Sequence, residues 1–170
     1  MSAVRVFIAG SRAISQLNEP LRARLDRIIA EGHEVLVGDA NGADRTVQQY
    51  LADRRYRYVT VYCTGERCRN NVGVWVTAAI APPPGVRGGA DFYAVKDREM
   101  AANATHGLML WDGESRGTLT NIKNLVRDRK PVVVYFSPSK TFLTIKTATD
   151  LDALLAQATP TAKHEIRRHA

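Results

Sequence analysis

The sequence contains no apolar run of the roughly 18 residues that a membrane-spanning helix needs. Of its 170 residues, 45% are hydrophobic and 24% are charged, the balance of an ordinary globular chain. The amino terminus enters a strand-like run at Val4 without the basic, apolar and small-residue regions of a secretory signal. The sequence therefore predicts a cytoplasmic protein that makes no membrane contact.

Cysteine and histidine are scarce as well. The two cysteines, Cys63 and Cys68, lie five positions apart, and the four histidines are scattered without the spacing of zinc ligands. Because disulfides are rare in a reducing cytosol, we predict that both thiols are free. The sequence predicts no metal site and no bound cofactor.

Basic residues outnumber acidic ones, 24 to 17, which gives a net charge of +7. They are spread along the chain, and some of them lie in residues 161–170, which we predict to be a solvated, basic C-terminal tail. The chain has no basic run with interspersed aromatic residues and no recognition-helix motif. The sequence therefore does not favour nucleic acid as a partner.

Strand-like and helix-like segments alternate along the chain. Short β-branched runs and segments with helical spacing of apolar residues follow one another, and glycine or asparagine marks their ends. The predicted strands are 4–9, 34–37, 58–63, 108–111, 132–136 and, at an edge, 142–145. This order predicts a single α/β domain over residues 1–160, a Rossmann-like three-layer sandwich with a mostly parallel sheet.

Residues 64–91 interrupt the alternation. The run 82–85 is Pro-Pro-Pro-Gly, and Gly88 and Gly89 follow, so regular structure is disfavoured there. We predict a long loop insertion over 64–91, followed by a helix from Phe92. A lid over the site and a plain surface insertion are both compatible with this composition.

Two turns that follow predicted strands carry candidate ligand-binding residues, since ligands of such sheets lie beyond the carboxyl ends of the strands. In the first turn a guanidinium group suited to phosphate follows a glycine and a serine. In the second turn two glycines flank a helix start, and its aspartate is a candidate for ribose hydroxyls. The candidates are Gly10, Ser11, Arg12, Gly38, Asp39, Gly42, Ala43 and Asp44. For Asp44, helix capping is favoured over direct ligand contact.

A third turn, residues 113–118, opens a helix after the strand at 108–111. Ser115, Arg116, Gly117 and Thr118 combine backbone amides, hydroxyls and a guanidinium group, which together suit one phosphate. The spacing is neither that of a Walker A loop nor that of the Gly-x-Gly-x-x-Gly fingerprint. The three turns predict a site for an anionic ligand, a small nucleotide or NAD-derived compound.

In this order the motifs resemble the SLOG superfamily, which includes the DNA-processing DprA proteins, the LOG nucleotide hydrolases and the YpsA-like proteins. The first two turns are similar to the YpsA-like branch, and Arg98, which precedes Gly117 by 19 positions, resembles the arginine of the LOG pattern. The resemblance covers residues 4–136. It implies that Gly117 and Thr118 bind phosphate, that Arg98 lies beside the phosphate or the glycosidic bond, and that two subunits pair.

One position departs from the LOG pattern. Its catalytic glutamate stands three positions after the threonine, where this sequence has Asn121. An amide cannot act as a general acid or base, so the LOG-type reaction is disfavoured. If the protein is an enzyme, the candidate catalytic residues are Arg98, Asp39, Asp112 and Glu114, whereas Glu99 is better explained as a surface residue.

Three functions are compatible with these observations. The favoured one is nucleotide binding, with ligand sensing as its purpose. The alternative is N-glycosidic cleavage of a nucleoside 5′-monophosphate, and the third is binding of single-stranded nucleic acid. Trp111, at the end of a predicted strand, suits either stacking on a base or packing in the core, and the core is slightly favoured.

Overall fold

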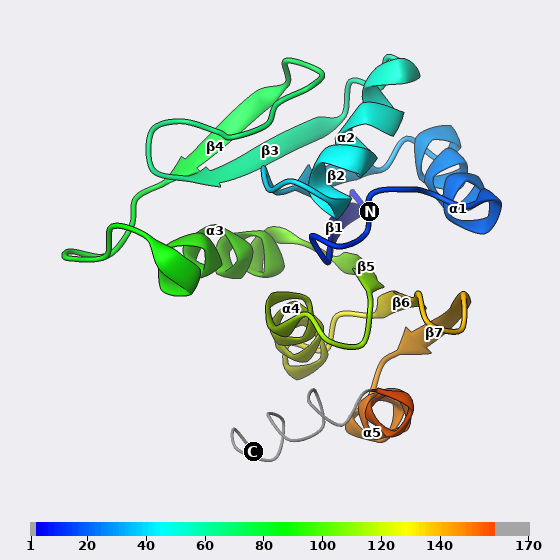
Figure 1. Cartoon of the computed structure of the whole chain (residues 1–170). Helices are drawn as coiled ribbons and strands as arrows, with labels where there is room; N and C mark the ends of the chain where they lie inside the picture. Colours follow the sequence, from blue (N-terminus) through cyan, green and yellow to red (C-terminus); the bar gives the residue numbers. More distant parts are fainter. Residues whose placement is uncertain (1–2, 159–170) are drawn as a thin grey trace.

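The computed structural model describes residues 3–158, so the predicted basic tail at 161–170 lies outside the described residues. A central sheet is covered by helices on both faces (Figure 1). The strands are β1 (Arg5–Gly10), β2 (Glu34–Val37), β3 (Val59–Thr64), β4 (Val76–Ile80), β5 (His106–Trp111), β6 (Val132–Phe136) and β7 (Thr141–Ile145). The helices are α1 (Glu19–Ala30), α2 (Ala43–Asp53), α3 (Gly89–Asn103), α4 (Arg116–Arg127) and α5 (Ala148–Gln157).

The sheet has seven strands in the order β4-β3-β2-β1-β5-β6-β7. Each neighbouring pair is parallel except β6 and β7, which are antiparallel. The predicted Rossmann-like α/β fold is therefore confirmed, including the edge strand near 142–145. The strand order reverses between β1 and β5, so the carboxyl ends of these two neighbours form the switch point where ligands bind in such sheets.

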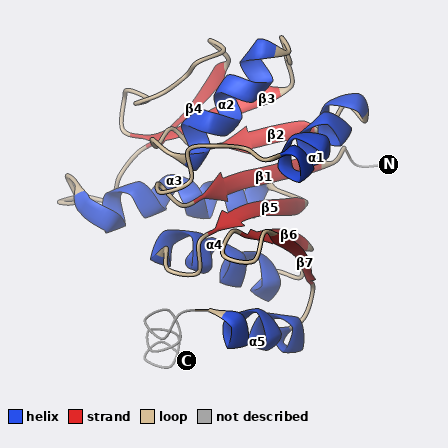
Figure 2. Cartoon of the chain, turned by 45° about the vertical axis from the view of Figure 1, so that its right-hand side comes forward, coloured by secondary structure: helices blue, strands red, loops and turns tan. Residues whose placement is uncertain are grey.

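Two apolar cores lie on opposite faces of the sheet, beneath the helices that Figure 2 shows on each face. One core packs α1 and α2 against β1, β2 and β3, and the other packs α3, α4 and α5 against β5 and β6. Because both faces are covered, the central strands are apolar along their whole length, as in Val35–Val37 and Leu108–Trp111. None of the helices within residues 3–158 is long and apolar enough to cross a membrane.

Local sequence sets the ends of α1. The Asn18 side chain accepts a hydrogen bond from the Leu21 amide at 3.1 Å, and Pro20 lies in the first turn. Gly32 adopts φ of 70° after the last turn, and the amides of Gly32 and His33 bond back to Ile29 and Ile28. These signals are local, so the sequence predicts this helix correctly.

The predicted loop over 64–91 is wrong in part, because it contains β4. Residues 76–80 pair in parallel with residues 60–64 of β3, and α3 begins at Gly89, ahead of the predicted Phe92. The β4 strand lies at the edge of the sheet and Val76 is exposed, so its composition lacks the apolar run of a buried strand. Its pairing with β3 is a tertiary interaction that composition does not report.

The prediction of two free thiols is also wrong. Cys63 at the end of β3 and Cys68 form a disulfide, with their Cα atoms 5.1 Å apart. The turn after β3 reverses the chain within a few residues and brings Cys68 back to the strand end, which is the separation that a disulfide requires. The bridge holds the segment that leads into Arg69.

Candidate functional site

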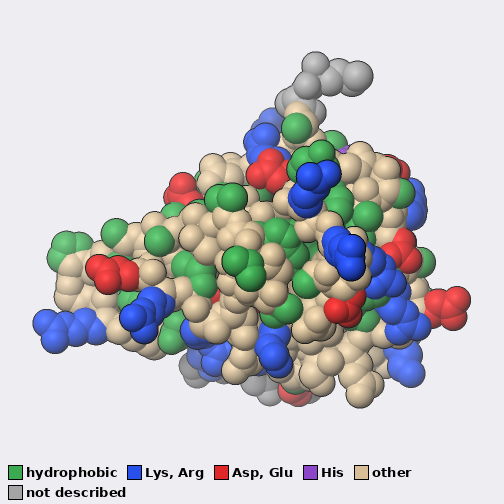
Figure 3. Space-filling view, turned by 90° about the horizontal axis from the view of Figure 1, so that it is seen from above, with side chains coloured by type: hydrophobic (Ala, Val, Ile, Leu, Met, Phe, Trp, Pro, Cys, Tyr) green, Lys and Arg blue, Asp and Glu red, His purple; other side chains and the backbone are tan. Residues whose placement is uncertain are grey.

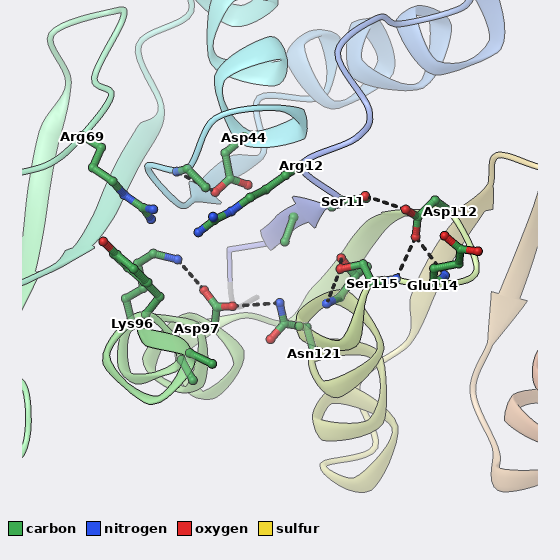
Figure 4. Close-up of a pocket in the computed structure, with 18 of the residues that line it drawn as sticks. Ser11, Arg12, Asp44, Arg69, Lys96, Asp97, Asp112, Glu114, Ser115 and Asn121 are labelled. Atoms are coloured by element: carbon green, nitrogen blue, oxygen red, sulfur yellow. Dashed lines mark hydrogen bonds and ion pairs between the residues drawn. The ribbon is translucent and has the colours of Figure 1, made fainter. Parts of the chain in front are cut away.

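A cavity of about 630 Å³ lies at the carboxyl ends of β1 and β5 (Figure 4). Its walls come from the turns after β1, β2 and β5, from the segment after Cys68, and from α3 and α4. Side chains of both charges reach it, among them Arg12, Arg69, Lys96, Asp44 and Asp97. The switch point of the sheet therefore brings charged side chains of both signs together in one cavity.

The turn between β5 and α4 is built around Asp112. Its carboxylate accepts hydrogen bonds from the Ser115 amide at 2.8 Å, the Glu114 amide at 2.9 Å and the Ser11 hydroxyl at 2.8 Å. Although partial burial opposes ionisation, these bonds hold the pKa of Asp112 below its usual value. Asp112 therefore orders the turn and ties it to the turn after β1, while Glu114 is exposed beside it.

Ser115 caps α4. Its hydroxyl oxygen accepts a hydrogen bond from the Thr118 amide at 3.4 Å and lies 3.0 Å from the Thr118 hydroxyl. Ser115, Gly117 and Thr118 all line the cavity, so the start of the helix faces it. A helix N-terminus carries partial positive charge and amide donors, which suits an anion.

The turns after β1 and β2 pack against each other. The Ala43 amide donates to the Ser11 carbonyl at 3.2 Å, and Gly42, with φ of 79°, lies against the backbone of Arg12. A Cβ on Gly10 would lie 2.6 Å from the Leu110 carbonyl oxygen and 2.8 Å from the Ala43 Cβ. Close packing of α2 against β1 and β5 therefore requires glycine at position 10.

Asp44 is buried at the base of the cavity. Its Oδ2 accepts a hydrogen bond from the Ala40 amide at 3.1 Å, while the N-cap position of α2 is Gly42. A Cβ on Gly38 would lie 2.6 Å from Asp44 Oδ2 and 3.1 Å from Lys96 Nζ, so the carboxylate and the ammonium group converge beside Gly38. Burial raises the pKa of Asp44 to about 7, although the Lys96 charge opposes this.

Asp39 holds Arg69. Its side chain is 3% exposed and accepts hydrogen bonds from the Arg69 amide and from Arg69 Nη2, each at 2.8 Å. The Arg69 guanidinium group lies 4.0 Å from the ring centre of Tyr93, and that of Arg12 lies 5.8 Å from it. Asp39 therefore positions a cation of the cavity and does not itself line it.

Helix α3 presents Lys96 and Asp97 to the cavity. Lys96 Nζ donates to Asp97 Oδ1 at 2.7 Å, and the Asn121 amide group donates to Asp97 Oδ2 at 3.2 Å. Arg98 and Glu99 on the next positions are exposed and do not line the cavity. The structure thus places Arg98 on the solvent side of the helix.

The structure brings most of the candidate residues together at this cavity. Those that line it are Gly10, Ser11, Arg12, Asp44, Asp112, Glu114, Ser115, Gly117 and Thr118. Those that do not line it are Gly38, Asp39, Gly42, Ala43, Arg98 and Arg116. For both groups of candidates, a role in contacting a ligand stays a prediction.

Four charged or aromatic residues of the cavity were not among the predicted site residues, namely Arg69, Tyr93, Lys96 and Asp97. Three of them lie on α3, where Met100 and Ala101 are buried. Lys96 and Asp97 precede these two buried residues by four positions, so they lie on the same face of the helix. Arg98 does not lie on that face. Apolar and polar residues are hardly separated around α3, so its buried face was not readable from the sequence, and the position of Arg69 depends on the path of the chain after the disulfide.

Within residues 3–158, no group of three or more His, Cys, Asp or Glu side chains is arranged to hold a metal ion.

Substituting Asp44 by asparagine is expected to change how stability depends on pH. The carboxyl pKa is 3.8 in the unfolded chain and about 7 in the folded one, so only the folded state holds this proton between those values. Asp44 therefore costs stability as pH rises through that interval, by at most about 1.4 kcal/mol per pH unit. Asp44→Asn lacks this loss and should gain stability relative to the wild type from pH 5 to pH 7. Urea unfolding at several pH values measures the difference, and a difference that does not vary with pH would contradict it.

These observations define the class of the protein: it is a Rossmann-like α/β protein with a polar cavity at the switch point of its sheet. No protein-family model matches the sequence, and no curated protein matches it. Among solved structures it is similar to DNA processing protein A from Helicobacter pylori, with a TM-score of 0.58 and 13% identity over 97% of this chain and 79% of that one. DNA processing protein A from Streptococcus pneumoniae gives a TM-score of 0.55 and 13% identity over 92% of this chain and 62% of that one.

At this identity the similarity establishes the fold. The chain has the DprA-like fold that its resemblance to the SLOG superfamily implied. The prediction that nucleic acid is disfavoured as a partner is wrong, because the Helicobacter pylori protein of this fold binds single-stranded DNA. The prediction considered only runs of basic residues along the sequence and known motifs. Folding can bring basic side chains together from segments that are distant in sequence, and such a surface leaves no linear run.

Proposed function

We propose that this protein binds a nucleotide or nucleotide derivative, with the phosphate in the cavity at the switch point. The observation that carries the proposal is the convergence of Arg12, Arg69 and the start of α4 on one cavity. Guanidinium groups form charge-assisted, paired hydrogen bonds with phosphate, and helix amides add donors. These groups come from three separate segments, so the proposed anion site depends on the tertiary fold.

The other lining residues favour a ligand with hydroxyl groups as well as a phosphate. Carboxylates of Asp97 and Glu114 reach the same cavity as the arginines. A carboxylate repels phosphate but accepts hydrogen bonds from hydroxyls, as acidic residues do for ribose in dinucleotide-binding folds. A cavity that offers both cationic groups and carboxylates therefore suits a sugar phosphate better than inorganic phosphate.

Ligand sensing is the role that we favour within this function, and membership of the YpsA-like branch stays a prediction. Asp112 is committed to three hydrogen bonds within the turn, and Asp39 is committed to Arg69. Asn121 occupies the position of the LOG glutamate and donates to Asp97. Asp39 and Asp112, two of the three carboxylates considered for catalysis, thus have structural partners, which supports binding over glycosidic hydrolysis.

Single-stranded nucleic acid is a second candidate ligand, favoured by a groove beside the cavity. This groove, which we call the second groove to distinguish it from the cavity, has a volume of about 720 Å³. It is lined by residues that include Arg22, Arg45 and Gly42. The turn that carries Arg12 continues into its wall at Ser15. A chain of phosphates bound in the cavity would extend along it. On the face shown in Figure 3, basic side chains are dispersed with acidic ones among them.

Substituting Arg12 by alanine tests the proposal. Removing one charge-assisted phosphate contact is expected to weaken binding of nucleoside monophosphates by about tenfold or more. Arg12 is exposed, so the melting temperature without ligand should change little. Calorimetric titration with mononucleotides and with the matching nucleosides measures the effect. Nucleosides that bind as well as their phosphates would contradict the phosphate site.

Two further variants complete this experiment. A loss of affinity in Arg98→Ala as large as that in Arg12→Ala would support the contact that the family resemblance implied for Arg98. Because Arg98 is exposed and does not line the cavity, we expect Arg98→Ala to leave mononucleotide affinity unchanged. Arg45→Ala should also leave it unchanged, but should weaken binding of a short oligonucleotide if the second groove holds a strand. A steep loss of oligonucleotide affinity with salt would accompany that result.

A further inference from the structure

Asp97 is a cavity carboxylate that two helices hold in place while leaving it accessible. Its side chain is 22% exposed, and its carboxylate accepts hydrogen bonds from Lys96 on the same helix and from Asn121 on α4. Lys96 is 4% exposed, so the ammonium group that balances the Asp97 charge is itself buried. The carboxylate is thus fixed from two helices at the point where they meet (Figure 4).

Hydrogen-bonding capacity is left over at Asp97. An ionised carboxylate offers about four lone-pair sites and no donor. Lys96 and Asn121 each use one oxygen, which leaves acceptor sites on both oxygens of a group that lines the cavity. Two adjacent acceptors of this kind match two donors on neighbouring atoms, as in the vicinal hydroxyls of a ribose.

The other acidic residues near the cavity do not offer the same arrangement. Asp39 is bound to Arg69, and Asp112 accepts bonds from Ser11 and two turn amides. Asp44 is 6% exposed at the base of the cavity, whereas Glu114 is exposed. Asp97 is therefore the described carboxylate that is both oriented and available.

Asp97 is close to the proposed phosphate site, because its partner Asn121 is on the helix whose start would hold the phosphate. Asn121 follows Thr118 by three residues on α4, which corresponds to about 4.5 Å along the helix axis. Asp97 is bound to α4 at Asn121, within about one helical turn of the residues that would hold the phosphate, so one nucleotide can contact both. A 5′-phosphorylated ribose lying across that turn would direct its ring hydroxyls to the carboxylate.

We propose that Asp97 makes this cavity selective for ribonucleotides over 2′-deoxyribonucleotides by accepting hydrogen bonds from the ribose hydroxyls. Asn121 and Lys96 act as positioning residues that orient its carboxylate. The inference rests on the proposed function, since the phosphate must occupy the arginine and α4 side of the cavity. It adds the sugar as the determinant of specificity and leaves the base open.

The test compares matched nucleotide pairs by calorimetric titration. The ligands are AMP with 2′-deoxyAMP and UMP with 2′-deoxyUMP, and the proteins are the wild type, Asp97→Asn and Glu99→Gln. We expect the wild type to prefer each ribonucleotide by about tenfold or more, since a hydrogen bond to a charged group is lost in its partner. In Asp97→Asn the preference should fall to about threefold or less. Glu99→Gln removes the same charge from an exposed position of α3 and should keep the preference.

The ratio of ribonucleotide to deoxyribonucleotide affinity distinguishes a role of Asp97 in sugar recognition from general damage to the cavity and from failure of the proposed phosphate site. General damage to the cavity weakens both members of a pair and leaves their ratio unchanged. Equal affinities in the wild type, or an unchanged ratio in Asp97→Asn, would overturn the role of Asp97, while sensitivity to Arg12→Ala would still support the phosphate site. Absence of binding of all four nucleotides to the wild type would overturn the proposed function and this inference together.

Discussion

Substituting Gly42 by alanine is expected to lower the free energy of unfolding by about 3 to 5 kcal/mol. Two costs add at this position. Gly42 has φ of 79°, a left-handed conformation that costs a residue with a Cβ about 1 to 2 kcal/mol. In addition, the new Cβ would lie 2.6 Å from the Arg12 carbonyl carbon, and the backbone there is held by the bond from the Ala43 amide to Ser11. Relief of the clash must separate the two turns that form the cavity, so nucleotide binding should be lost as well.

Gly32 provides a matched control for this substitution. It has φ of 70° at the end of α1, and a Cβ built on it meets no atom within 4 Å. Gly32→Ala should therefore cost only the conformational term, about 1 kcal/mol. Urea unfolding of the two variants measures both values. Equal losses would show that the contact between the turns contributes nothing to stability.

Substituting Trp111 by alanine is expected to destabilise the protein by about 3 to 5 kcal/mol, because it leaves a large cavity in the core. Trp111 is fully buried and packs on Phe136, with ring centres 5.8 Å apart. Its indole NH donates to the Ser115 carbonyl at 3.0 Å, so the residue also fixes the start of α4. Core packing is thus its place in the structure, and a base does not reach its ring.

Trp111→Phe separates packing from the hydrogen bond. It keeps most of the ring volume and leaves the Ser115 carbonyl without this donor, so it should cost less stability than alanine but weaken phosphate binding. Trp75→Phe is the control, since its indole NH donates to the Tyr56 carbonyl at 2.7 Å away from the cavity. Denaturant unfolding and nucleotide titration check both variants. Equal effects of the two variants on affinity would contradict a role of Trp111 in shaping the phosphate turn.

The strand and helix pattern of this chain is largely readable from its sequence, because its signals are local. Buried strands such as Val132–Phe136 are short β-branched or apolar runs, and Asn18 and Gly32 mark the ends of α1. The edge strand β4 carries no such signal, since it is half exposed and follows no apolar pattern. The disulfide was missed for a related reason, since only the path of the chain after β3 shows that Cys63 and Cys68 meet.

The candidate site was predictable to a similar extent. Turns that follow strands were identified correctly as the walls of one cavity, since parallel strands end on the same edge of the sheet. The choice of Arg98 on α3 followed a family pattern, whereas helical periodicity places Lys96 and Asp97 on the buried side. Asp39 was expected to contact ribose, and the structure pairs it with Arg69 instead, a residue 30 positions away.

By itself, the sequence determined the α/β class, the parallel sheet and the turns that carry glycine, serine and arginine, because periodicity and turn chemistry act over a few neighbouring residues. Only the tertiary structure decided which charged groups share the cavity. Four segments bring Arg12, Arg69, Asp97 and Asn121 together, through the pairing of β1 with β5 and the packing of α3 on α4. Charged groups interact through space at short range, so the partners of each group depend on which segments the fold brings beside it. Local sequence does not specify which segments become neighbours.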